Sequence, residues 1–136
     1  MIPTTRAELQ MMAPQKHERI RQEKVQEMVE TIYANVLTTA EDPATTRLYR
    51  HLLKRSNEHG YRKYSDAFLE TNMAEILDKV RALFPDCTVT HTELLTVLDH
   101  NGTQQFSEVP PVCNYPVNSP LIWISTFLIV DWSGRR

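Results

Sequence analysis

Two cysteines and a histidine are the side chains best suited to nucleophilic or metal chemistry. Cys87 and His91 are four residues apart in a segment whose alternating pattern predicts a strand. They would then share one face but lie about 13 Å apart, too far for two ligands of one ion or for a Cys–His dyad. Cys113 lies well beyond both, and no CxxC, HxH or HExxH motif occurs. The pattern therefore predicts reduced, buried cysteines and no catalytic residue, metal ligand or cofactor.

Three aspartates could form a carboxylate pair for Mg²⁺ binding or acid–base chemistry. Asp86, Asp99 and Asp131 each stand at the end of a predicted element. Turn formation and capping explain Asp86 and Asp99 without any function. Asp131, between apolar neighbours, stays open: it is either a functional carboxylate or a group that caps the chain or pairs with a cation.

A basic stretch with interleaved tyrosines runs from residue 47 to residue 63. Arg47, Arg50 and Lys54 are spaced to share one face of a predicted helix. Such a face could follow a phosphate backbone, align with an acidic protein surface, or be an ordinary solvated surface. The residues that we expect to make partner contacts are Arg47, Arg50, Lys54, Arg55, Arg62 and Lys63.

The segment from Val109 to Pro120 contains four prolines. Because proline fixes its backbone torsion and lacks an N–H, the segment is predicted to be extended and semi-rigid. It is either a crossover packed on its own domain or a polyproline-like segment that binds a partner. Pro110 and Pro111 are the weaker candidates for partner contacts.

Composition places the chain among single-domain globular proteins. Of 136 residues, 41% are hydrophobic and 24% charged, and the net charge is −2. With 3 glycines, there is no Gly-rich phosphate loop. The longest apolar run, residues 121–130, is about half of the roughly 20 residues that a membrane helix needs. The N-terminus lacks the regions of a signal peptide, so we expect no such leader.

The N-terminal half is predicted to be helical. Thr5 and Glu8 form a capping box that opens a short helix, which Pro14 limits or kinks. A long helix over residues 15–40 follows, with its apolar stripe at helical spacing. Asp42 and Pro43 then start a second helix, which Gly60 ends, and the third runs over residues 73–84 with Asn72 as its N-cap.

The C-terminal half changes to strand periodicity. Residues 87–98 alternate, Asn101-Gly102 predicts a hairpin turn, and residues 103–108 form a polar return strand at the sheet edge. The apolar segment 121–132 is predicted to be the central strand.

We therefore expect an α+β fold, with N-terminal helices followed by a helix packed on a small, mostly antiparallel, three-stranded sheet. The expected division is a helical, basic region at 1–63 and an α+β domain at 64–136. Lys and Arg exceed Asp and Glu by 11 to 8 in the first, and fall short by 4 to 9 in the second. The N-terminal helices either cover the sheet or project as an interaction arm.

Three segments resemble small proteins of nucleocytoplasmic large DNA viruses. The first is Arg81–Thr92, in which a helix end, Phe-Pro-Asp-Cys and a strand follow one another. The second is Ile129–Ser133, a hydrophobic strand with Asp-Trp-Ser, and the third is the opening Pro3–Glu8. The resemblance implies a viral protein made in the host cytoplasm, and it carries no catalytic residues with it.

The function that we expect is that of a non-enzymatic structural protein of the virion, a minor capsid component that binds major and minor capsid proteins. The alternative is a small nucleic-acid-binding protein that uses the basic helix around residues 47–63. An enzyme built on Cys87, His91 and Asp131 is a third hypothesis, which requires these groups to converge in one cleft.

Overall fold

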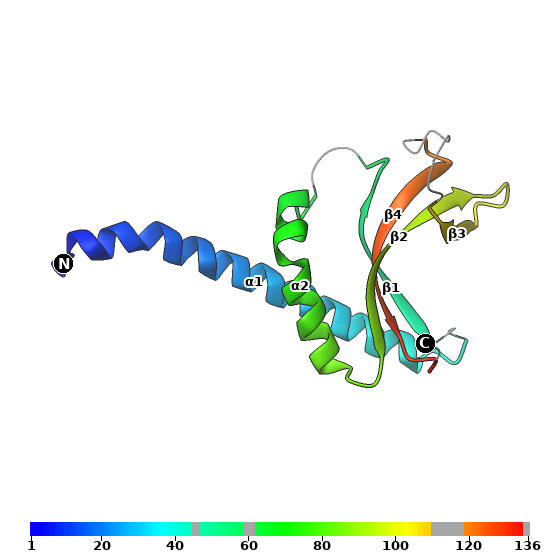
Figure 1. The fold of residues 1–136 in the computed structure, drawn as a ribbon, viewed down its shortest axis with the longest axis horizontal. Helices are drawn as coiled ribbons and strands as arrows, with labels where there is room; N and C mark the ends of the chain where they lie inside the picture. The colour runs from blue at the N-terminus through cyan, green and yellow to red at the C-terminus, as the bar shows by residue number, and fades with distance from the viewer. Residues whose placement is uncertain (45–46, 59–61, 110–118, 135–136) are drawn as a thin grey trace.

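Two helices and four strands make up the part of the chain that this computed structural model describes, namely residues 1–44, 47–58, 62–109 and 119–134 (Figure 1). In chain order they are α1 Arg6–Glu41, β1 Leu48–Arg55, α2 Asp66–Leu83, β2 Thr88–Leu98, β3 Gln104–Glu108 and β4 Ile122–Asp131. The fold is α+β, as predicted, but the sheet has four strands instead of three.

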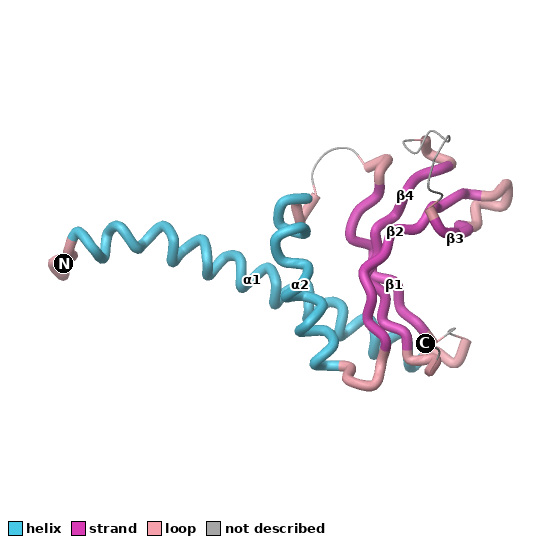
Figure 2. The backbone as a smooth tube through the Cα atoms, viewed as in Figure 1, coloured by secondary structure: helices cyan, strands magenta, loops and turns pink. Residues whose placement is uncertain are grey.

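The sheet is antiparallel throughout, with strand order β1-β4-β2-β3. The apolar strand β4 lies between β1 and β2, which confirms its predicted central place. The turn at Asn101-Gly102 joins β2 to the edge strand β3, as predicted, and Gly102 takes a positive φ of 78° there. Figure 2 shows the helices as one layer beside this sheet.

The helix predicted for residues 43–60 is wrong, because residues 48–55 form strand β1. Tyr49 lies opposite Val130 of β4, and the register shifts between Leu52 and Lys54. This irregularity leaves apolar side chains at neighbouring positions, which imitates helical spacing in the sequence. The predicted helix start at Asp42 is also wrong: Asp42 caps the C-terminal end of α1 and accepts a hydrogen bond from the Ala44 amide.

The predicted pair of helices around Pro14 is one continuous helix, α1. Its N-cap is confirmed, since Thr5 Oγ1 accepts a hydrogen bond from the Glu8 amide at 3.2 Å. Pro14 lies inside the helix, where it removes one backbone hydrogen bond without ending the element. The predicted apolar stripe is buried in the core at Val25, Met28, Val29, Ile32 and Val36.

Helix α2 begins at Asp66, seven residues before the predicted start. Ser65 is its N-cap and accepts a hydrogen bond from the Phe68 amide at 3.1 Å. Asn72, the predicted cap, is instead buried within the helix, where it donates to the Phe68 carbonyl and accepts from Arg21 of α1. A long-range partner therefore determines the role of this polar side chain.

One hydrophobic core lies between the helices and one face of the sheet. It combines the buried stripe of α1 with Ile76 and Val80 of α2 and with Val89, Leu128 and Val130 of the sheet. Tyr49 and Leu53 of β1 pack against it. The core therefore draws on residues from both sides of the division expected at residues 63 and 64.

The opposite, helix-free face of the sheet is strongly curled. Although β1 and β3 are at opposite edges, the guanidinium of Arg50 lies 5.0 Å from the ring centroid of Phe106. Phe106 also packs edge-on against Phe127, at 5.4 Å between centroids. This curl buries Trp123 and Phe127 on a face that no described helix covers.

Candidate functional site

The N-terminal part of α1 projects from the body of the protein as a helical arm, residues 1–20 (Figure 1). Every residue of the arm is exposed, and Arg21 is the first partly buried residue of the helix. At the base of the arm, Arg21 donates to Asn72 Oδ1 at 2.9 Å and to Glu75 Oε2 at 3.1 Å. These bonds anchor α1 to α2 at the point where the arm begins.

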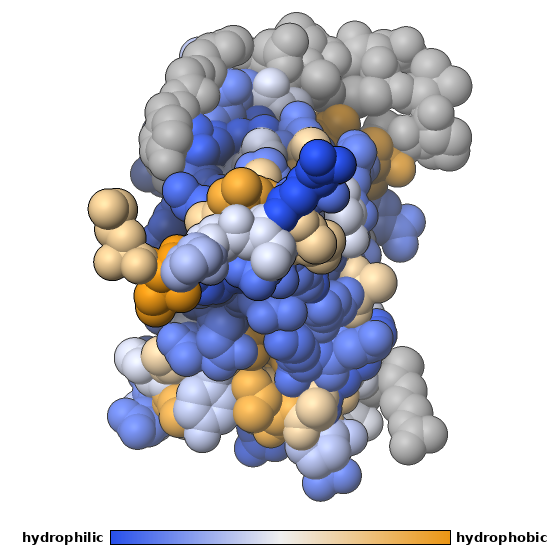
Figure 3. Space-filling model, turned by 90° about the vertical axis from the view of Figure 1, so that its left-hand side faces the viewer, coloured by the Kyte–Doolittle hydropathy of each residue, from blue (hydrophilic) through white to orange (hydrophobic). Residues whose placement is uncertain are grey.

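The arm exposes large apolar side chains to solvent. Leu9 is 57% exposed, Met12 58% and Ile20 37%. Leu9 and Ile20 are three helical turns apart and therefore share one face of the helix. Viewed towards the N-terminal end, the surface has hydrophobic patches among hydrophilic residues (Figure 3). The sequence predicted a projecting N-terminal arm as one of two alternatives, but none of the residues expected to make partner contacts lies in it.

The six basic residues predicted to make contacts do not share one surface. Arg50 and Lys54 lie in strand β1, and Arg47 directly precedes it with a positive φ of 65°, so the predicted common helix face is wrong. Arg50 and Arg55 lie over Phe106 and Trp123 on the helix-free face. The nucleic-acid alternative depended on the common face, and it loses that geometric basis.

Three basic residues of this group form ion pairs. Lys54 and Arg62 bind Asp66 at the start of α2, at 3.4 and 2.6 Å. Lys63 pairs with Glu27 of α1. These ion pairs join the segment before α2 to its neighbours. The described residues do not include Pro110, Pro111, Cys113 or Gly60.

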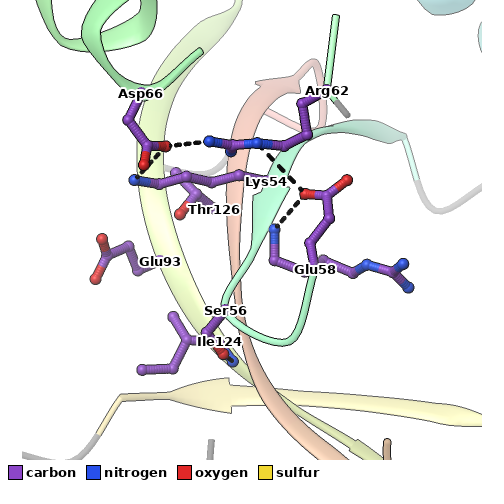
Figure 4. Close-up of a pocket in the computed structure, with 9 residues that line it drawn as sticks. Lys54, Ser56, Glu58, Arg62, Asp66, Glu93, Ile124 and Thr126 are labelled. Atoms are coloured by element: carbon purple, nitrogen blue, oxygen red, sulfur yellow. Dashed lines mark hydrogen bonds and ion pairs between the residues drawn. The ribbon is translucent and has the colours of Figure 1, made fainter. Parts of the chain in front are cut away.

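A polar pocket lies between β1, β2, β4 and the start of α2 (Figure 4). The hydrogen bond from Arg62, with the charge of Lys54, holds the pKa of Asp66 below its ordinary value. Arg62 also approaches Glu58 at 4.0 Å. The cations and carboxylates that line the pocket are equal in number, so its formal charge is balanced. The residues that line it are Lys54, Arg55, Ser56, Glu58, Arg62, Asp66, Glu93, Ile124 and Thr126.

Cys87 and Asp131 come together at the ends of β2 and β4, where Thr88 is opposite Asp131. Burial raises the pKa of the Cys87 thiol, and the charges of Asp86 and Asp131 raise it further. This direction is opposite to that of an activated thiolate nucleophile. His91 lies further along β2, opposite Leu128, and its side chain is exposed.

The three aspartates do not form one carboxylate site. Asp99 accepts hydrogen bonds from the Asn101 and Thr103 amides at 2.8 and 2.9 Å, which confirms its turn role. Asp131 accepts one from the Ser133 amide at 2.8 Å. Asp86 and Asp99 lie beyond opposite ends of β2. Among the described residues, no three His, Cys, Asp or Glu side chains are grouped to hold a metal ion, and no helix is long and apolar enough to cross a membrane.

Two of the segments that carry the viral resemblance are neighbours in the fold. Val89, from the first segment, lies opposite Val130, from the second. Arg81 Nη2 also donates to the Val89 carbonyl at 3.0 Å, which joins the end of α2 to the same place. These segments, distant in the sequence, therefore form one structural unit.

No family model, curated protein or solved structure matches this chain. The functional conclusion therefore rests on the residues and their geometry. Among the described residues, none covers the arm, and every residue of it is exposed.

Proposed function

We propose that this chain is a non-enzymatic structural protein of a virus particle, a minor capsid component that binds other capsid proteins. The observation that carries the proposal is the exposed helical arm. The arm lies outside the core of its own chain, yet it presents Leu9, Ala13 and Ile20 along one side. We call these three residues the arm face.

The energetics of the arm favour a partner. Most helical stability in proteins comes from a packed apolar face, which the arm lacks, and a proline inside a helix costs about 3 kcal/mol. An adjoining protein surface that covers the arm face would supply the packing that the chain itself does not. Burial of one large apolar side chain stabilises by about 1.5–3 kcal/mol.

The virion assignment rests on the resemblance of the segments around Val89 and Val130 to viral proteins. In this proposal the folded body holds the arm in position, and the arm inserts between major or minor capsid subunits during assembly in the host cytoplasm. Apolar burial supplies the affinity, and the flanking charges of the arm set its orientation.

The test is incorporation into particles. Particles of the virus that encodes the chain are purified by density gradient and washed with high salt, and the chain is quantified by mass spectrometry against the major capsid protein. We expect a constant ratio across independent preparations. Absence from purified particles, with abundant protein in infected cells, would contradict the proposal.

A variant identifies the surface. Leu9→Asp combined with Ile20→Asp places charge on the arm face, and we expect incorporation to fall about tenfold or more. Gln10→Asp combined with Gln15→Asp is the matched control, because it adds the same two charges at exposed polar positions of the same helix. Equal incorporation of both variants would exclude the arm face as the binding surface.

A further inference from the structure

A second exposed surface of α1 extends from the arm onto the body. We call it the α1 ridge, and its residues follow one another at alternating intervals of four and three, which keeps them on one side of the helix. All are exposed, and they are Met12, Lys16, Arg19, Glu23, Gln26, Glu30, Tyr33 and Leu37. Two shallow grooves run along this side and meet at Arg19.

The chemical character of the ridge changes in order along the helix. It begins apolar at Met12, becomes basic at Lys16 and Arg19, is acidic at Glu23 and Glu30, and ends apolar at Tyr33 and Leu37. The whole helix shows the same division of charge. Residues 6–24 contain 5 Lys and Arg and 3 Glu, whereas residues 25–41 contain no Lys or Arg and 3 Glu.

The order of apolar, basic and acidic residues along the ridge is complementary to that of a second copy that runs in the opposite direction. If a second α1 lies antiparallel on the first, with the midpoint between Glu23 and Gln26, Met12 meets Leu37 and Arg19 meets Glu30. Lys16 then lies against the ring of Tyr33, an arrangement that favours a cation–π contact. Each contact occurs twice, as a two-fold interface between identical surfaces requires.

We propose that the α1 ridge is the contact surface of a homodimer, in which the basic arm of one copy lies along the acidic half of α1 of the other. The paired region from Met12 to Leu37 would extend about 38 Å, at 1.5 Å per residue. Tyr33 and Leu37 are 41% and 43% exposed, so the body supplies an apolar seat for the Met12 end of the arm.

The bonds that the ridge residues make within one chain do not prevent this pairing. Arg19 lies 4.0 Å from Glu23, and Gln26 donates to Glu30 at 3.0 Å. Both pairs are solvent-exposed contacts between neighbouring turns, which contribute little and exchange readily. Tyr33 stacks on Phe84 at 5.6 Å between centroids, which holds its ring in place for Lys16 of the other copy.

The homodimer and the capsid assignment can be tested separately. The α1 ridge and the arm face are adjacent sides of the helix, and they share no residue. A dimer whose chain is absent from virus particles would contradict the proposed function and leave the dimer intact. A monomer that is incorporated into particles would contradict the homodimer and leave the proposed function intact.

The experiment measures the mass of the full-length chain by light scattering over a range of protein concentrations. We expect the wild type to dimerise. Arg19→Glu and Glu30→Arg should each raise the dissociation constant about tenfold or more, because two symmetric sites exchange attraction for repulsion. Lys79→Glu, a charge reversal on the exposed surface of α2, is the control and should leave it unchanged.

Rescue decides the geometry. The double variant with both Arg19→Glu and Glu30→Arg should dimerise like the wild type, and so should a mixture of the two single variants. A wild-type monomer at every concentration would overturn the proposal. A dissociation constant that neither charge reversal changes would also overturn it. So would a dimer that forms in neither the double variant nor the mixture of single variants. Circular dichroism of each variant verifies that α1 is intact.

Discussion

Ser125 joins two other buried polar groups on the helix-free face of the sheet. Its hydroxyl lies 2.9 Å from Trp123 Nε1, which donates to it, and 2.8 Å from Thr96 Oγ1. All three residues are buried on the curled sheet. Buried polar groups of this kind stabilise a fold only while each of them keeps a partner.

Replacement of Ser125 tests this arrangement. Ser125→Ala leaves the indole N–H of Trp123 without its acceptor, so we expect a loss of about 1–3 kcal/mol in the free energy of unfolding. Thr96→Val should lose less, because Ser125 still accepts from Trp123. Urea unfolding followed by tryptophan fluorescence measures both. Equal losses would show that the indole bond contributes nothing.

His51 is the residue for which we expect a pH effect. Asn35 Nδ2 donates to Tyr49 Oη at 2.9 Å, and this oxygen lies 2.9 Å from His51 Nδ1. The chain of bonds joins α1 to β1. Burial lowers the pKa of His51 below its ordinary value of 6.5, so the folded protein favours the neutral imidazole.

The sign of the effect follows from proton binding. Below pH 6.5 the imidazole takes up protons more readily in the unfolded chain than in the folded one, so stability falls as the pH falls towards the folded-state pKa. His51→Gln removes this titration. We expect the melting temperature of the variant to change less than that of the wild type between about pH 7 and 5. Parallel profiles would show that His51 is not responsible.

At the scale of elements, α1 combines two segments of different stability. Residues 25–36 bury the apolar stripe in the core, whereas the arm has no such packing. Most helical stability in proteins comes from a packed apolar face. The arm therefore depends on local propensity, on the Thr5 cap and on the partner that we propose for it.

Replacement of Pro14 by Ala tests this dependence. The change restores a backbone hydrogen bond at an exposed position and removes a penalty of about 3 kcal/mol from the arm helix. We expect stronger helical ellipticity at 222 nm and slower amide exchange in the arm, without a change in the unfolding of the core. Gln15→Ala is the control and should have only a small effect. Identical spectra for Pro14→Ala and the wild type would contradict the expectation.

At the scale of the whole molecule, the body and the arm are separable by burial. The core begins at Val25 and includes strands from the N-terminal and C-terminal halves of the chain. Arg21 closes the contact between α1 and α2 at the base of the arm.

Deletion of residues 1–20 should therefore leave the body folded. These residues are all exposed and contribute no side chain to the core. We expect a cooperative unfolding transition within a few degrees of that of the full chain, together with loss of dimerisation. Calorimetry and light scattering of the shortened protein measure the two properties. A shortened chain without a cooperative transition would show that the arm belongs to the fold.

Local patterns in the sequence predicted much of the fold. The Thr5 cap, the buried stripe of α1, the hairpin turn at Gly102 and the central place of β4 all depend on neighbouring residues or on simple periodicity. Such features need no distant partner, so a single sequence is enough to recognise them.

Tertiary structure alone decided the identity of β1 and the place of Asn72. A short segment with apolar residues at consecutive positions fits either a helix or an irregular strand, and the free edge of β4 selects the strand, because backbone groups at that edge need partners. Asn72 fits a helix cap in the sequence, but Arg21 and the Phe68 carbonyl satisfy it inside α2. For the same reason the basic residues diverged: strand geometry places neighbouring side chains on opposite faces, and no local pattern specifies which element they join.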